Sequence, residues 1–144
     1  MQPEVPARPR PFPDAETAPY WEAAARGELR VQRCSACGTH RFYPRALCPA
    51  CHDDAHEWVR ASGRGEVHSF SVVRRAPSPA FAARVPYAIA MVALEEGPHM
   101  LSEVVGIDPD RVAIGLAVEV DFEDIGEGMR LPVFRPRGTR PAAP

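Results

Sequence analysis

The feature that most constrains this chain is a pair of CxxC motifs that together hold all four of its cysteines. The first is Cys34-Ser-Ala-Cys37-Gly38 and the second is Cys48-Pro-Ala-Cys51. Four thiolates on two tight turns can enclose one metal ion in a tetrahedron, and zinc is the usual occupant of such an all-sulfur site. The sequence therefore predicts a closed, structural zinc site with Cys34, Cys37, Cys48 and Cys51 as ligands. No free thiol is then left for catalysis.

Iron remains open as the metal, because it also binds four thiolates. A rubredoxin-like electron carrier is therefore an alternative, and the red colour of the oxidised iron form would distinguish it. Two disulfides fit less well, since the chain starts Met1-Gln2-Pro3 without an apolar signal segment, which favours a reducing cytoplasm. The neighbouring histidines His40, His52 and His56 are expected on the surface, because a closed site needs no further ligand.

Composition and charge exclude several classes of function. All seventeen basic residues are arginine, so the chain offers no lysine for a Schiff base. Residues 60–134 carry seven arginines against eleven acidic residues, so this segment is negatively charged. A nucleic-acid-binding surface needs an excess of positive charge, which this segment does not have. The chain also contains neither a glycine-rich phosphate loop nor a stretch of eighteen apolar residues. We therefore expect neither a stand-alone enzyme nor a membrane span.

Residues 17–27 are expected to form a short helix, with Thr17 as its N-cap and Gly27 just after its end. Tyr20 and Trp21 lie on one side of this helix, together with Ala24. Such an aromatic stripe can pack against its own domain or bind a partner protein. The second interpretation is favoured by the frequent use of aromatic side chains as anchors in protein interfaces. Tyr20 and Trp21 are therefore candidate partner-binding residues.

The second half of the chain is expected to be all β. Alternating segments bounded by turns predict strands near 66–75, 86–94, 99–105, 116–123 and 129–134, with one helical turn before the fourth. Five short strands indicate a small closed barrel of the OB type, although an SH3-like barrel would give a similar pattern. The predicted organisation is a flexible tail (1–14), the helix and zinc ribbon (15–58), the barrel (59–136) and a second flexible tail (137–144). The fold class is thus mainly β.

Residues that carry a family resemblance occur along most of the chain. They are Tyr20-Trp21-Glu22, Gly27, 32–38, Tyr43-Pro44-Arg45, 48–51, Gly65-Glu66-Val67, Ser69-Phe70, Pro86-Tyr87 and Ile114-Gly115. Together they resemble the DUF35 family, in which an N-terminal helix and a rubredoxin-like zinc ribbon precede an OB-fold. The resemblance implies an accessory subunit of thiolase-superfamily enzymes acting on acyl-CoA thioesters, such as lipid-transfer-type thiolases, side-chain aldolases or acetyltransferases. Some relatives pair with or are fused to hot-dog-fold hydratases.

The expected role is therefore non-catalytic: the chain completes its partner and helps to seat CoA. Arg74 and Arg75 precede a proline-rich loop containing Phe81, and guanidinium groups beside an aromatic ring suit the phosphates and adenine of CoA. These three residues are the candidate CoA contacts, although a solvated loop would look the same. The competing hypotheses are a single-stranded nucleic-acid-binding module and a stand-alone acyl-CoA carrier or weak thioesterase.

Overall fold

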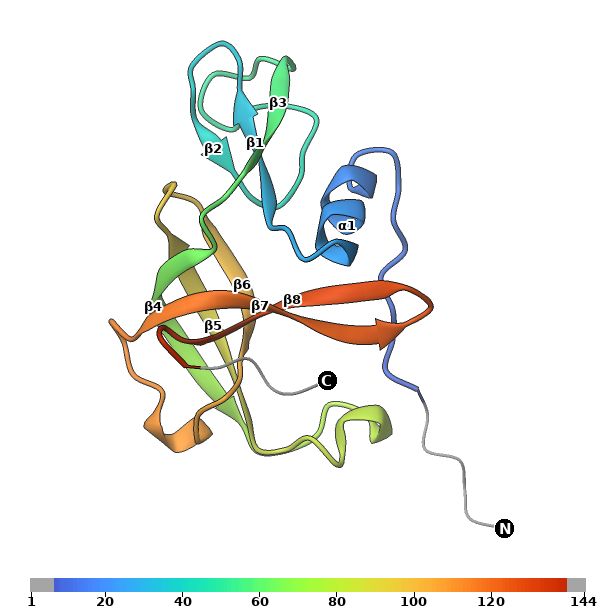
Figure 1. Cartoon of the computed structure of the whole chain (residues 1–144), viewed down its shortest axis with the longest axis vertical. Coiled ribbons are helices and arrows are strands. Elements are labelled where there is room, and N and C mark those ends of the chain that lie inside the picture. Colours follow the sequence, from blue (N-terminus) through green and yellow to red (C-terminus); the bar gives the residue numbers. More distant parts are fainter. Residues whose placement is uncertain (1–6, 140–144) are drawn as a thin grey trace.

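The computed structural model describes residues 7–139, which comprise a short helix, a three-stranded ribbon and a five-stranded barrel (Figure 1). Helix α1 spans Ala18–Ala25, with Thr17 at its N-cap and Gly27 in the left-handed region at φ +77°. The two 3-10 turns, η1 (Pro79–Phe81) and η2 (Pro109–Arg111), lie in the loops that precede β5 and β7. The chain is mainly β with one N-terminal helix, as the sequence predicts.

The ribbon has β1 (Arg30–Cys34) at its centre, flanked by β2 (His40–Arg41) and β3 (His56–Arg60), both antiparallel to it. Strand β2 is only two residues long. The Arg41 guanidinium donates to the carbonyl of Arg45, and this bond holds the following residues in a turn toward the second CxxC motif. The ribbon sheet also extends to Arg60, slightly beyond the expected boundary at residue 58.

The barrel consists of β4 (Arg64–Val73), β5 (Tyr87–Leu94), β6 (His99–Val104), β7 (Ala117–Gly126) and β8 (Met129–Pro136). It closes in the order β4-β5-β6-β8-β7, and every neighbouring pair is antiparallel except β6 and β8, which are parallel. This order, with the third and fifth strands side by side in parallel, is the five-stranded OB topology. It confirms the OB prediction over the SH3-like alternative.

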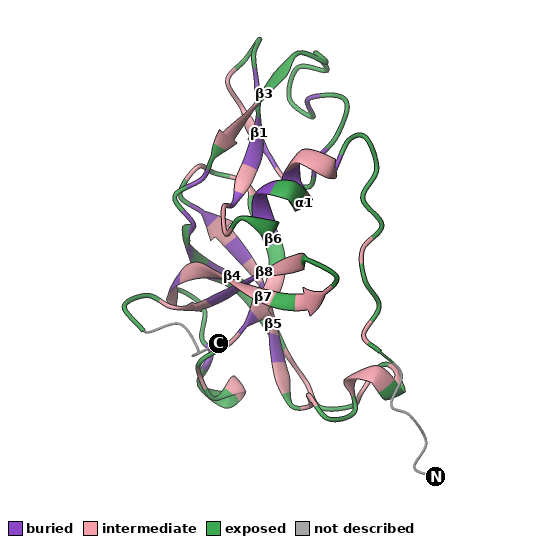
Figure 2. Ribbon diagram, turned by 45° about the vertical axis from the view of Figure 1, so that its right-hand side comes forward, coloured by how far each residue is buried: buried purple, intermediate pink, exposed green. Residues whose placement is uncertain are grey.

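One hydrophobic core connects all three parts of the molecule. Along β5 the buried residues Ala88, Ala90, Val92 and Leu94 alternate with half-buried ones, and Figure 2 colours the ribbon by this burial. The same cluster of buried side chains includes Leu29 and Val31 at the base of the ribbon and Tyr20 of α1. The helix and ribbon are therefore packed onto the barrel through shared apolar contacts.

Gly65 lies where β4 pairs with both β5 and β7, opposite Leu94 and Val118. A Cβ atom at this position would lie 2.6 Å from the carbonyl oxygen of Ala93 and 2.7 Å from a methyl group of Val92. We expect Gly65→Ala to lower the free energy of unfolding by about 1–3 kcal/mol, the usual cost of overpacking. Chemical denaturation measures this, with Ser62→Ala as an exposed neighbouring control. Equal stabilities would contradict the close approach.

The described part of the N-terminal tail runs along the barrel. Arg8 and Arg10 form ion pairs with Glu123 and Glu127, at 3.6 and 2.9 Å, so this segment contacts the protein where a solvated tail was expected. Residues 137–139 continue from β8. The remaining tail residues, 1–6 and 140–144, lie outside the described residues.

Candidate metal centre and its surroundings

The four cysteines converge on one point at the tip of the ribbon. Their sulfur atoms all lie within 4.8 Å of one another, and none of the four is in a disulfide. The Sγ atoms of Cys34 and Cys51 are 3.6 Å apart, and those of Cys37 and Cys48 are 3.7 Å apart. A regular tetrahedron with metal–sulfur bonds of about 2.3 Å places its sulfurs about 3.8 Å apart. The spacing therefore fits a single tetrahedral metal ion.

Two matching turns shape the site. In the first, the N–H of Gly38 donates to the carbonyl of Cys34 at 2.9 Å, and in the second the N–H of His52 donates to the carbonyl of Cys48 at 2.8 Å. Gly38 and His52 each follow the second cysteine of their motif, and both have positive φ values of 76° and 64°. His52 thus occupies the position that Gly38 fills in the other turn. It is exposed, as predicted, and the sulfur cluster does not include it.

The electrostatics of the sulfurs favour a bound cation. Hydrogen bonds from the side chain and main chain of Thr39 lower the pKa of Cys37 to about 6. Hydrogen bonds from backbone N–H groups, of which that of Cys51 has the largest effect, lower the pKa of Cys48. A bond from the backbone of Asp53 lowers the pKa of Cys51, but crowding by Cys34 and the other cysteines raises it to about 12. Four clustered thiols cannot all ionise unless a positive charge compensates them.

A buried polar network, which sequence analysis missed, supports the ribbon. Gln32 and Arg41 are 2% and 3% exposed, and Arg41 Nε donates to Gln32 Oε1 at 2.8 Å. The same oxygen accepts the N–H of Arg45 at 2.8 Å, while Gln32 Nε2 lies 3.2 Å from His56 Nε2. These contacts join β1, β2, β3 and the turn before Cys48. Strand β1 reads Arg-Val-Gln-Arg-Cys, so its pattern of polar residues does not distinguish the buried Gln32 from the arginines beside it.

The two candidate partner-binding aromatics lie in different environments. Tyr20 is 3% exposed and packs edge-on against Trp21, at 4.9 Å between ring centres, and against Phe42 at 5.6 Å. Burial raises the pKa of Tyr20, consistent with its place in the core. Trp21 is half-buried, and Tyr43, whose ring centre lies 6.1 Å from that of Tyr20, is 43% exposed. The accessible aromatic surface here is thus formed by Trp21 and Tyr43, while Tyr20 supports them from below.

The three candidate CoA contacts have different neighbours in the structure. Arg74 forms an ion pair with Asp110 of η2, and Arg75 is exposed. The ring of Phe81 is half-buried against Tyr87, and the guanidinium carbon of Arg8 lies 5.6 Å from the ring centre. Phe81 is therefore engaged by a different arginine from the two named in the sequence analysis.

The fold and the sulfur cluster together define a four-cysteine ribbon protein with an OB-fold barrel. Two family models match the chain in succession: the ChsH2 rubredoxin-like zinc ribbon domain over residues 21–57 and the ChsH2 C-terminal OB-fold domain over residues 58–123. A DUF35 domain-containing scaffold protein of Methanothermobacter thermautotrophicus is 37% identical over 114 residues, covering 78% of this chain and 85% of the relative. The chain belongs to the DUF35 family.

Longer relatives and a solved structure are also similar. A probable enoyl-CoA hydratase alpha subunit of Thermomonospora curvata is 41% identical over 129 residues, 90% of this chain, but the chain spans only 40% of that relative's length. A chain of the solved Ltp2-ChsH2(DUF35) aldolase superposes with a TM-score of 0.79 at 40% identity, with 88% of this chain and 98% of that chain covered. Within residues 7–139, no helix is long and apolar enough to cross a membrane.

Proposed function

We propose that this chain is a non-catalytic accessory subunit that binds and completes a thiolase-type enzyme acting on acyl-CoA thioesters. The observation that carries the proposal is the match to the DUF35 chain of the Ltp2-ChsH2 aldolase, because 98% of that chain is covered at 40% identity. The name of the Methanothermobacter relative, a scaffold protein, supports the same role. The metal of the four-cysteine site is zinc in this proposal, and it holds the ribbon rather than taking part in chemistry.

The chemistry of the described residues is consistent with a non-catalytic role. All four thiols belong to the metal site, and the chain has no lysine. The outer acidic residues of β7 are engaged in ion pairs: Arg135 contacts Glu119 and Asp121, and Arg84 contacts Glu123. An acidic barrel surface of this kind disfavours the nucleic-acid-binding alternative, which needs exposed positive charge.

A hydratase is the second candidate partner. The Thermomonospora curvata relative and one from Mycobacterium tuberculosis, named a 3-oxo-4,17-pregnadiene-20-carboxyl-CoA hydratase alpha subunit, favour it. The latter is 44% identical over 121 residues, and this chain spans 37% of its length. Both candidate partners act on CoA thioesters, so the role of this chain is the same in either complex.

An affinity purification from the native host, followed by reconstitution, tests the proposal. We expect a thiolase-type subunit to be recovered in near-equal amount and its activity on acyl-CoA to rise when this chain is added. Recovery of a hydratase subunit would select the second candidate instead. A partner that is equally active alone, or recovery of nuclease-sensitive material, would contradict the accessory role.

Trp21 provides a prediction for the interface. Because the half-buried Trp21 and the exposed Tyr43 both pack on Tyr20, Trp21→Ala is expected to weaken partner binding by about 2 kcal/mol or more, as for an aromatic anchor. The effect on barrel stability should be smaller than this. Isothermal titration with the purified partner measures the first effect and thermal unfolding the second. Leu101→Ala, which removes an exposed side chain from β6, is the control. An unchanged dissociation constant for Trp21→Ala would remove α1 from the interface.

A further inference from the structure

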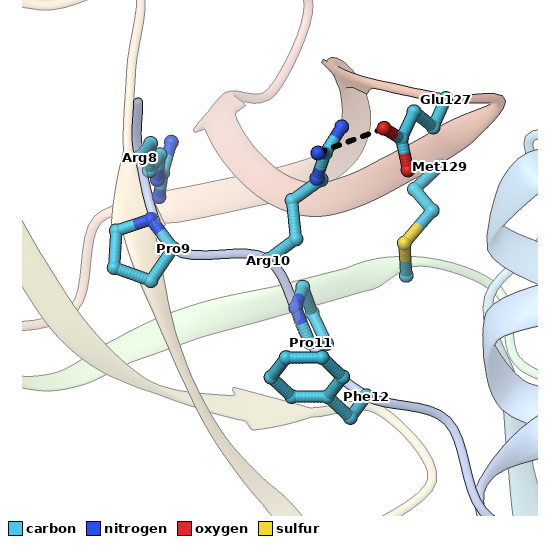
Figure 3. A pocket seen from close by; sticks show the side chains of 7 residues that line it. All are labelled: Arg8, Pro9, Arg10, Pro11, Phe12, Glu127 and Met129. Atoms are coloured by element: carbon cyan, nitrogen blue, oxygen red, sulfur yellow. Dashed lines mark ion pairs between the residues drawn. The ribbon is translucent and has the colours of Figure 1, made fainter. Parts of the chain in front are cut away.

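An extended arm, residues 7–13, crosses the barrel surface beside the β7–β8 hairpin (Figure 3). Its sequence alternates arginine or phenylalanine with Pro9, Pro11 and Pro13, a pattern that favours an extended polyproline conformation and removes main-chain donors. Within residues 7–139, no main-chain hydrogen bond joins the arm to the barrel. The arm is therefore held by its side chains alone.

These side-chain contacts are few and imperfect. The guanidinium of Arg8 lies 3.6 Å from Glu123 and 4.0 Å from Glu103, and its Nη1 is buried without a hydrogen bond among the described residues. Arg10 makes a closer pair with Glu127, at 2.9 Å, but Glu127 is largely exposed. The exposed pair of Arg10 and Glu127 contributes about 0.2–1 kcal/mol, and the partly buried Arg8 lies too far from both carboxylates for a hydrogen bond. The arm is thus held weakly enough to be displaced.

The arm also leaves the surface beneath it incompletely filled. One hollow of about 420 Å³ lies between Arg8–Phe12 and Met129, and a second of about 310 Å³ lies between Arg8, Arg84 and Ile125. Phe12 is 96% exposed and does not fill either hollow. Both hollows are bounded in part by the arm itself, so the arm does not lie closely packed on the surface beside it.

The charge of this surface specifies what else can bind there. Its walls carry four carboxylates, from Glu103, Glu123, Asp124 and Glu127, and one guanidinium, from Arg84, which leaves a net charge of −3 before the arm adds its two arginines. Arg84 is already engaged with Glu103 and Glu123, at 2.7 and 3.1 Å. The ring of Phe81 accepts the guanidinium of Arg8 on its face. This acidic groove suits cations and repels phosphate groups.

We propose that the acidic groove is a docking site for an arginine-bearing extended segment of a partner protein, and that the arm occupies it as an intramolecular placeholder. A partner segment whose arginines contact these carboxylates more closely than Arg8 does would displace the arm. The tether gives the arm an effective concentration in the millimolar range, so a competing segment must exceed that advantage. This site goes beyond the accessory role and does not depend on which enzyme is the partner.

A peptide with the sequence of residues 7–14 serves as the probe. It is titrated at low ionic strength into the full chain and into the full chain carrying Arg8→Ala and Arg10→Ala, and amide chemical shifts of residues 123–129 are followed by NMR. We expect the peptide to bind the double variant about ten-fold more tightly than the wild type, because the arm no longer competes. Salt should weaken this binding.

Three further measurements decide the result. Adding Glu123→Gln to the double variant should reduce peptide binding, whereas Glu95→Gln, in the β5–β6 turn, should leave it unchanged. A peptide with both arginines replaced by alanine should not bind. Equal binding to wild type and double variant, or binding that survives Glu123→Gln, would overturn the proposal. It would also be overturned if CoA shifted the same amides, because the groove would then be an anion site.

Discussion

Replacing Cys48 by serine is expected to release the metal and unfold the ribbon. Cys48 is fully buried, and its sulfur lies 3.7 Å from that of Cys37 within the four-sulfur cluster. Structural zinc contributes an apparent binding free energy of about 10–16 kcal/mol in isolated zinc modules, which is as large as the whole stability of a typical domain. Metal content by mass spectrometry should fall from stoichiometric to undetectable. The ribbon amides should also lose their protection from hydrogen exchange.

His40→Gln is the matched control for this variant. His40 lies in β2 beside the site, but the sulfur cluster is complete without it. The control should therefore keep its metal and its stability. Normal metal content in Cys48→Ser would show that the ligand assignment is wrong. A visible absorption band in the wild type would identify the metal as iron, since zinc is colourless.

The effect of metal loss is expected to extend beyond the ribbon. Leu29 and Val31 belong to the same buried cluster as Val118 and Phe134 of the barrel. Unfolding the ribbon would expose these contacts, so the barrel should lose stability as well. Treating the wild type with a strong chelator should reproduce the behaviour of Cys48→Ser.

The sequence predicts the barrel well because one side of each strand is buried. In β5 the alternation separates the two faces of the strand, and the turns at residues 95–97 and 126–128 fix the register. The closing order of the strands could not be read from alternation alone. It depends on β6 lying parallel to β8, a long-range contact between strands that are separated by β7.

The ribbon and the arm show where local patterns fail. Strand β2 ends at Arg41 because the side chains of Arg41 and Gln32 bind the backbone of Arg45 in place of a strand ladder. The cysteine spacing predicted the cluster of four sulfurs directly, since four ligands of one type admit few arrangements. The pairing of Arg8 with Glu123 joins residues distant in sequence, and no local pattern marks it.

Truncating Phe134 is expected to have the largest effect on the barrel itself. Phe134 is fully buried in β8, where it pairs with Val120 of β7 and Val104 of β6, at the junction that closes the barrel. A buried Phe→Ala change costs about 3–5 kcal/mol, since it removes a large apolar side chain and leaves a cavity. This is a large part of the roughly 5–15 kcal/mol that stabilises a typical domain. Urea unfolding of the metal-loaded protein measures the loss.

Phe12→Ala is the matched control, because Phe12 is 96% exposed on the arm. Its free energy of unfolding should stay within about 0.5 kcal/mol of the wild type, as for other surface substitutions. Metal content should be normal in both variants, because neither residue touches the sulfur cluster. If Phe134→Ala instead lost its metal at ambient temperature, the ribbon would depend on the barrel for its fold. If the two phenylalanine variants were equally stable, Phe134 would not be the closing contact of the barrel core.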